Sequence, residues 1–275
     1  MYDFEESLTQ GVAYVVSTPS GLRRVVPPGN FVWLGNFDVP GLAPGRSVTV
    51  YVPSDHVRDH TRGALYLFDG QNVFDDTYAF AGGWFAHDAL DSIGRRDRNI
   101  PILVGIAHGG EGRIDELSPW RMRMGGGKLD VLLDWIVETL GPRVQRDFAL
   151  RAGPLGSVVG GSSLGGLAAL YAHFRHPEFF GGSLALSPSL WVANGGIFRF
   201  IAEQSKPYVS RIYVDCGGQE GGGRMLPMAE QLTREVRNRG YSPNQLMFRP
   251  DVNAGHNERA WRRRLPKAFR FMFKA

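Results

Sequence analysis

The residues with the clearest capacity for chemistry lie in one glycine-rich segment, Ser157–Gly166. The pattern Gly161-x-Ser163-x-Gly165 is typical of a nucleophile elbow, a strained strand-to-helix turn that exposes a serine hydroxyl. An apolar pair of valines precedes it, and an alanine- and leucine-rich stretch that favours a helix follows it. The amino end of that helix would stabilise an anion forming beside the serine. Because 36 of the 275 residues are glycine, the alternative is a plain turn with an incidental serine.

A serine hydroxyl needs a neighbouring base that removes its proton before it becomes a good nucleophile. His256 is the best candidate, because it lies in a loop after the last expected strand, Gln245–Arg249, and just before the terminal helix. The alternative is a helix-start residue without a catalytic role. The other six histidines have weaker claims from their positions in surface stretches, helices or early loops: His56, His60, His87, His108, His173 and His176.

The base in turn needs a carboxylate that fixes its tautomer and stabilises the imidazolium. The chain order serine, acid, histidine places this acid after the expected strand Arg211–Asp215. Glu220 is favoured because it lies on the loop at the carboxyl end of that strand. Asp215 and Asp251 remain as alternatives, and each of the three could instead be a solvated or helix-capping carboxylate.

An oxyanion formed beside Ser163 must be met by preorganised N–H donors. One is the backbone N–H of Leu164, the residue after the nucleophile. The second is expected in the loop after an early central strand, Ala64–Phe68. Gln71 is the preferred donor there, and Asn72 is the alternative.

The elements that must position these groups alternate between short β-branched runs and amphipathic segments. This alternation predicts an α/β fold with a mostly parallel sheet covered by helices on both faces. The first forty-odd residues, rich in proline and glycine turns, predict antiparallel edge strands. Residues 1–275 are expected to form a single domain. The expected strands are Ser47–Val52, Ala64–Phe68, Ile102–Ile106, Ser157–Gly160, Gly182–Leu186, Arg211–Asp215 and Gln245–Arg249. The expected helices are Trp84–Ile93, Leu129–Phe148, Leu164–His176, Met225–Arg239 and Glu258–Phe273.

Composition narrows the choice of partners. The single cysteine, Cys216, excludes an intrachain disulfide and is expected to be a buried packing thiol. The acidic start of the chain, Met1–Glu6, lacks the pattern of a signal peptide, and no window is apolar for the length of a membrane span, so a cytoplasmic protein is expected. Basic residues gather near the carboxyl end: Arg259, Arg262, Arg263, Arg264, Lys267, Arg270 and Lys274. They are expected to form the solvated face of a helix rather than a nucleic-acid or membrane patch, because no aromatic stacking platform accompanies them.

Six segments, taken together, resemble the esterase D-like family of α/β-hydrolases, which is related to enterochelin-type and feruloyl esterases. They follow one another in the family's order: Tyr66–Phe74, Gly105–Trp120, Gly161–Leu167, Ser187–Trp191, Tyr213–Glu220 and Gly255–Trp261. The resemblance implies the α/β-hydrolase fold, and it favours Glu220 as the acid and Gln71 as the second oxyanion donor. Two stretches depart from the family's usual wording, Cys216–Gln219 and Leu117-Ser118, and both lie beside the expected cleft.

These observations lead to the hypothesis of a serine esterase that cleaves a carboxylic ester through an acyl-enzyme, with no metal or organic cofactor. The alternatives are an acyltransferase on the same fold and a non-catalytic binding protein that retains it. Trp191, Phe74 and Trp120 are candidate pocket walls, and core packing is the alternative for each. The expected partner is a small-molecule ester: a siderophore, an acylated sugar or a short-chain ester. Neither a nucleic acid nor a membrane is expected as a partner, and the sequence does not indicate an oligomeric state.

Overall fold

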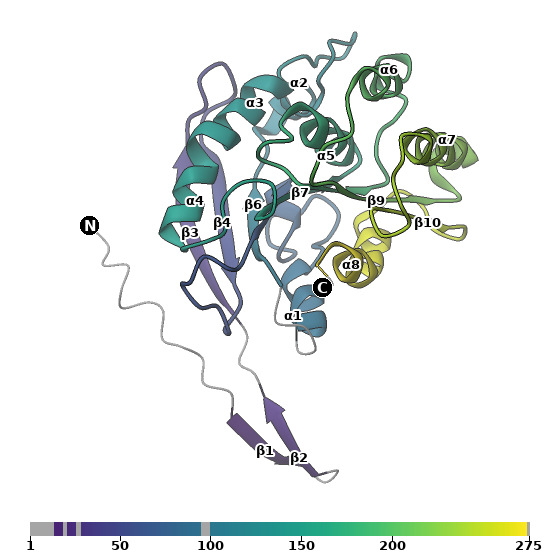
Figure 1. Ribbon diagram of the computed structural model, residues 1–275. Helices are drawn as coiled ribbons and strands as arrows, with labels where there is room; N and C mark the ends of the chain where they lie inside the picture. Colours follow the sequence, from purple (N-terminus) through teal and green to yellow (C-terminus); the bar gives the residue numbers. More distant parts are fainter. Residues whose placement is uncertain (1–13, 19–20, 26–28, 95–99, 274–275) are drawn as a thin grey trace.

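The fold is built on one eight-stranded sheet, seen in the computed structural model that describes residues 14–18, 21–25, 29–94 and 100–273 (Figure 1). The strand order is β10-β9-β8-β7-β5-β6-β4-β3. Neighbours from β10 through to β6 run parallel, whereas β4 is antiparallel to both β6 and β3. The predicted architecture, a mostly parallel sheet with antiparallel amino-terminal edge strands, is therefore confirmed.

The strands are short, and the central ones are buried along their whole length, as expected for parallel strands covered on both faces. Their bounds are β3 Asn30–Phe37, β4 Arg46–Val52, β5 Ala64–Phe68, β6 Ile102–Ile106, β7 Ser157–Ser162, β8 Gly182–Leu186, β9 Arg211–Gly217 and β10 Leu246–Asp251. Two further strands, β1 Tyr14–Thr18 and β2 Gly21–Val25, pair with each other in a separate two-stranded sheet.

Helices cover both faces of the large sheet (Figure 1). Apolar side chains of α3, α5, α6 and α7 pack into one cluster, and the apolar stripes of α1 and α8 pack into a second cluster across the sheet. The helix bounds are α1 Ala86–Gly94, α2 Arg113–Leu117, α3 Leu129–Trp135, α4 Gly141–Asp147, α5 Leu164–Arg175, α6 Gly196–Glu203, α7 Met225–Asn238 and α8 Glu258–Phe273.

The predicted helix Leu129–Phe148 is interrupted. A turn of π-helix, Ile136–Leu140, joins α3 to α4, and Pro142 at the start of α4 cannot donate a helical hydrogen bond. Two helices were not predicted. Five-residue α2 is too short for a periodic signal, and α6 follows a glycine pair that reads as a loop.

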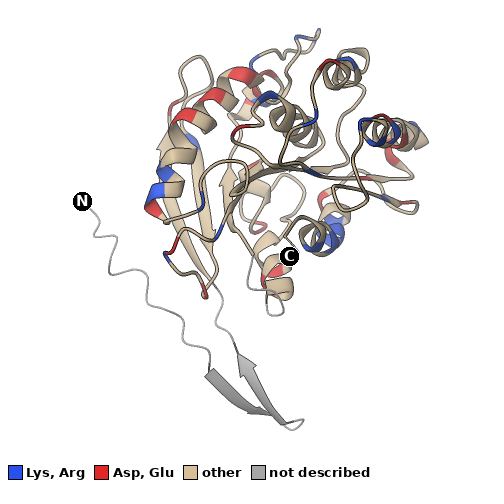
Figure 2. Cartoon of the chain, in the orientation of Figure 1, with Lys and Arg blue, Asp and Glu red and all other residues tan. Residues whose placement is uncertain are grey.

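The terminal helix α8 matches its predicted range, and it buries an apolar face made of Trp261, Leu265, Phe269 and Met272. Its basic residues are exposed, and Figure 2 shows Lys and Arg gathered along this helix. Arg264 is an exception that corrects the prediction: its side chain is only 7% exposed, because it points into the sheet side of the helix. Lys274 and the acidic start Met1–Glu6 lie outside the described residues. Within the described part of the chain, no helix is long and apolar enough to cross a membrane.

Candidate active site

The serine of the elbow holds a strained backbone. Ser163 has φ 56° and ψ −118°, between the end of β7 and the first residue of α5. Its N–H donates to the carbonyl of Leu186 at 2.9 Å, and its own carbonyl accepts from Leu167 at 3.1 Å, so both sides of the turn are fixed. A non-glycine residue with positive φ persists only where its surroundings impose it, and such strain gathers at functional sites.

The glycine two residues before the serine is required by a close approach of two backbones. A Cβ built on Gly161 would come within 2.7 Å of the carbonyl carbon of Gly165, where strand and helix cross. No larger side chain fits there without moving the turn. The G-x-S-x-G spacing therefore has the geometric cause that the sequence pattern predicts.

His256 lies against this serine, although 93 residues separate them. Its Nε2 is 2.9 Å from Ser163 Oγ, and its ring meets Trp261 edge-on with the ring centroids 5.0 Å apart. The loop that carries it is tied to the loop after β9. The N–H of Gly218 donates to Asp251, and that of Gln219 donates to Ala254. Because β9 and β10 are parallel neighbours, their carboxyl ends bring these two loops together.

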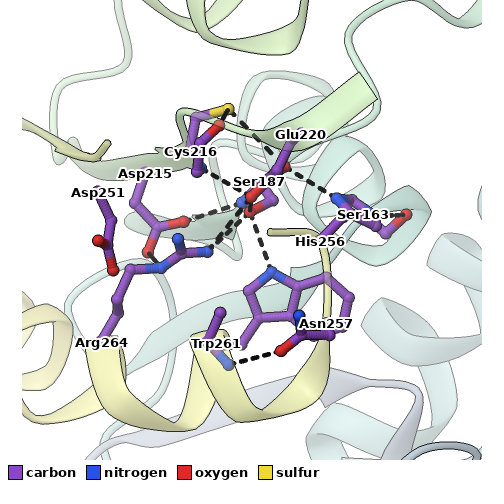
Figure 3. Close-up of polar contacts among 12 residues, drawn as sticks. Ser163, Ser187, Asp215, Cys216, Glu220, Asp251, His256, Asn257, Trp261 and Arg264 are labelled. Carbon is purple, nitrogen blue, oxygen red and sulfur yellow. Dashed lines mark hydrogen bonds and ion pairs between the residues drawn. The ribbon is translucent and has the colours of Figure 1, made fainter. Parts of the chain in front are cut away.

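Glu220 comes from the loop after β9 and faces the other side of the imidazole (Figure 3). Its Oε2 is 2.9 Å from His256 Nδ1, and its Oε1 accepts from Ser187 Oγ at 2.6 Å and from the N–H of Gly217 at 2.7 Å. Its side chain is fully buried. Burial alone would raise the pKa of this carboxyl, but the hydrogen bonds from His256, Ser187 and Gly217 hold it below its ordinary value.

The two alternative acids, Asp215 and Asp251, form ion pairs with arginines instead. Asp215 is fully buried beside Arg264, whose Nε is 3.0 Å from Asp215 Oδ2. Burial raises the pKa of Asp215 to about 7, although the guanidinium opposes the rise. Asp251 pairs with exposed Arg263 on α8. Of the three acids considered, the structure brings Glu220 to His256.

The direction of each hydrogen bond around Ser163 follows from which group carries a proton. An ionised carboxylate can only accept, so His256 donates from Nδ1 to Glu220, and a neutral imidazole then accepts at Nε2. Ser163 therefore donates its single proton to His256. Ser189 Oγ lies 3.2 Å from Ser163 Oγ and is 2% exposed. Since the proton of Ser163 is already engaged, Ser189 must be the donor in that contact.

Two backbone amides are the candidates for oxyanion donors. Leu164 is the first residue of α5, so its N–H has no carbonyl of an earlier helical turn to bond. Gln71 lies in a short 3₁₀ turn, Gly70–Asn72, after β5, which is the parallel neighbour of β7. The alternative donor, Asn72, already gives its N–H to the carbonyl of Asp69 at 2.8 Å. This engagement favours Gln71 over Asn72.

An ion pair braces that turn. Asp69 has φ 57° and ψ 46°, in the left-handed region, and its buried carboxylate accepts two hydrogen bonds from Arg113 on α2, at 2.6 and 2.7 Å. A bidentate guanidinium–carboxylate contact fixes direction as well as distance. The turn that presents Gln71 is thereby held from outside the sheet.

The three aromatic pocket candidates occupy different environments. Trp191 is 46% exposed, two residues after Ser189. Trp120 packs edge-on against Tyr171 and lies over Gly196. Phe74 is 7% exposed within the cluster beneath α1 and α8, where its ring meets that of Phe31. None of these contacts joins the three rings to one another.

Four residues around the triad were not predicted as site residues from the sequence: Ser187, Ser189, Trp261 and Arg264. Ser187, which has φ 44°, donates a hydrogen bond to Glu220. Arg264 on α8 donates a hydrogen bond to Ser187. The spacing of Trp261 and Arg264 indicates a shared face of the helix, because residues three positions apart lie side by side on a helix just after His256. Both bond to the hydroxyl of Ser187, at 3.0 and 2.8 Å.

Comparison with known proteins gives a family match over most of the chain. The model of the Esterase family, described as "Putative esterase", matches residues 42–272. "Uncharacterized protein YbbA" of Bacillus subtilis is 25% identical over 245 residues, which cover 84% of this chain and 94% of that protein. "Iron(III) salmochelin esterase" of Escherichia coli O6:H1 is 27% identical over 236 residues. That match covers 79% of this chain and 52% of the relative, so the chain spans about half of its length.

Among solved structures, the siderophore hydrolase EstA of Aspergillus nidulans superposes with a TM-score of 0.72 at 20% identity. The match covers 89% of this chain and 94% of that one. The likeness shows the α/β-hydrolase fold.

Proposed function

Because the chain belongs to the Esterase family, we propose that it hydrolyses a carboxylic ester with Ser163 as nucleophile, His256 as general base and Glu220 as the acid that orients the base. The observation that carries the proposal is the unbroken pair of 2.9 Å contacts from Ser163 to His256 and from His256 to Glu220. The first contact is short enough for direct proton transfer from Ser163 Oγ to His256 Nε2, and the second lets Glu220 hold the imidazole in place.

In the first half of the reaction, Ser163 Oγ bonds to the ester carbonyl carbon while its proton moves to His256 Nε2. The buried charge of Glu220 stabilises the imidazolium that forms. The carbon–oxygen bond to the alcohol then breaks, and His256 returns the proton to the leaving oxygen. Water repeats the sequence on the acyl-enzyme and releases the acid.

We assign the oxyanion of each tetrahedral intermediate to the N–H groups of Gln71 and Leu164. The two amides come from the carboxyl ends of adjacent parallel strands, which supports a common target. Both are backbone groups on fixed turns, so they need no reorganisation as the charge develops.

For the substrate, a siderophore ester is the first class to test. Relatives whose printed names are iron(III) salmochelin esterase and siderophore hydrolase support this choice. The exposed ring of Trp191, close in sequence to Ser189, offers an aromatic face for an aryl or acyl group. Trp120 is the second candidate wall.

The test is the substitution Ser163→Ala, measured with p-nitrophenyl acetate and with a siderophore trilactone. Turnover should fall by at least about three orders of magnitude, because the covalent step is lost. A fluorophosphonate probe should label the wild type and not the variant. Ser92→Ala on α1 is the matched control, because the Ser92 hydroxyl donates to the carbonyl of Ala89 on its own helix. This variant should keep full activity. Full activity of the Ser163 variant would end the proposal.

A further inference from the structure

A buried polar network lies behind Glu220, on the side away from His256 (Figure 3). Its centre is the hydroxyl of Ser187, which is fully buried in the loop after β8. Trp261 Nε1 donates to this oxygen at 3.0 Å and Arg264 Nη2 donates at 2.8 Å, both from one face of α8. The same hydroxyl lies 2.6 Å from Glu220 Oε1.

The two donors determine where the proton of Ser187 points. A hydroxyl oxygen accepts at most two hydrogen bonds and has one proton to give. With Trp261 and Arg264 occupying both lone pairs, the proton can go only to Glu220. The orientation of this rotor is therefore set by α8, the helix that begins two residues after His256.

Arg264 also brings a positive charge to the acid. Its Nη2 is 3.7 Å from Glu220 Oε1, and both side chains are almost fully buried. Asp215 anchors the guanidinium from β9 through the contact at Nε. Water screens such buried charges only weakly, so the guanidinium favours the ionised form of a carboxylate at this distance.

We propose that Arg264 is a positioning residue for catalysis, which turns Ser187 toward Glu220 and keeps that acid charged and aimed at His256. The inference rests on the proposed function, since it concerns the acid of the same site. Arg264 thereby differs from the two exposed arginines that precede it, Arg262 and Arg263.

The titratable groups around the network leave Arg264 as the counter-ion of Glu220 at acid pH. Burial raises the pKa of Asp215 to about 7, so this carboxyl is largely protonated at acid pH and Arg264 is then the counter-ion of Glu220. From β9, Tyr213 and Cys216 also face the network, and burial raises the pKa of each, so both stay neutral. His256 is the remaining titratable group in contact with the acid.

The test compares Arg264→Met with Arg264→Lys through the pH dependence of kcat/KM for p-nitrophenyl acetate. Methionine fills similar space without charge, whereas lysine keeps the charge. Removing the cation raises the pKa of Glu220, and this carboxyl must be ionised to support attack by Ser163. The acid limb of the Met variant should therefore move to higher pH by about one unit. The Lys variant should stay close to the wild type. A residue needed only for packing would give the opposite ranking, or no movement at all.

A second variant and a control guard against a folding defect. Ser187→Ala keeps Arg264 but removes one donor to Glu220, so its acid limb should move in the same direction by less. Arg263→Met, one position earlier on α8 and 64% exposed, should leave the limb unmoved. The rate of fluorophosphonate labelling at each pH gives the same profile without turnover. Hydrolysis by the wild type and its loss in Ser163→Ala are established first, so that an unmoved limb in Arg264→Met overturns this inference alone.

Discussion

Two buried arginine–carboxylate pairs, one with its arginine on β4 and the other with its carboxylate on β9, are built differently. Arg46 on β4 and Glu116 on α2 are each 1% exposed and meet through two hydrogen bonds. Arg46 also donates to the carbonyl of Ala107, and Glu116 accepts from the N–H of Gly109, both in the loop after β6. The two partners bond to each other and to this loop, which they fasten to the sheet, although Arg46 Nε has no hydrogen-bond partner among the described residues.

The second pair, Arg264 with Asp215, is shared. Its guanidinium meets Asp215 through Nε, bonds to Ser187 through Nη2 and lies near Glu220 as well. One cation thus serves two carboxylates, and one of those carboxylates bonds to His256. The comparison indicates that a closed pair stabilises the fold, whereas a shared pair carries charge to the site.

The largest expected effect on kcat distinguishes Glu220, which lies near the shared pair, from Glu116, which belongs to the closed pair. Glu220→Gln keeps the shape of the side chain but removes the charge that stabilises the imidazolium, so kcat should fall by about three to four orders of magnitude. Glu116→Gln, the same substitution in the closed pair, should leave kcat of the folded enzyme within about threefold. Steady-state rates, normalised to the concentration of protein that circular dichroism shows to be folded, measure both.

The ranking among the three candidate acids sharpens the same point. Glu220→Gln should cost much more rate than Asp215→Asn, and Asp251→Asn should cost least, because Asp251 pairs only with exposed Arg263. A larger loss in Asp215→Asn than in Glu220→Gln would transfer the role of the acid to Asp215.

The next effect concerns stability and tests the closed pair. Arg46→Ala strands a buried carboxylate, so the free energy of unfolding should fall by about 3–5 kcal/mol. Urea unfolding followed by circular dichroism measures this loss. Arg175→Gln breaks an exposed pair with Asp130 on the surface and should cost under about 1 kcal/mol. Equal losses in the two variants would mean that burial of the Arg46 pair adds nothing to stability.

Much of this fold is predictable from local pattern. The ranges of β5, β6, β8 and α8 match their predictions, because continuous apolar runs and a clear amphipathic stripe specify them. The strands that carry site residues run two residues longer than predicted: β7 ends at Ser162 and β9 at Gly217. Glycine, serine and cysteine residues form the last part of these two strands. Because glycine and polar residues have low strand propensity, propensity alone predicts that each strand ends earlier.

The site itself divides in the same way. Ser163, His256 and Glu220 were predicted from their chain order and from the loops that carry them. Arg264 was predicted to be solvated, because a run of arginines looks alike from the sequence and only packing shows which one faces inward. Ser187 lies in a segment that resembles the family, but the sequence indicates no function for it, because its contacts are with residues 33 and 77 positions away.

The smallest effect concerns Ser189, which joins the nucleophile to the same loop that holds the acid. Ser189→Ala removes the donor to Ser163 Oγ and frees the rotation of that hydroxyl. A lost hydrogen bond of this kind costs about 1 kcal/mol, so the acylation rate should fall about fivefold. The burst phase with p-nitrophenyl acetate in a stopped-flow instrument measures that rate directly. Ser183→Ala on β8 is the matched control, because this buried hydroxyl has no hydrogen-bond partner among the described residues. If Ser189→Ala acylates as fast as Ser183→Ala, then His256 alone orients the nucleophile, and the loop after β8 acts on the acid and not on the serine.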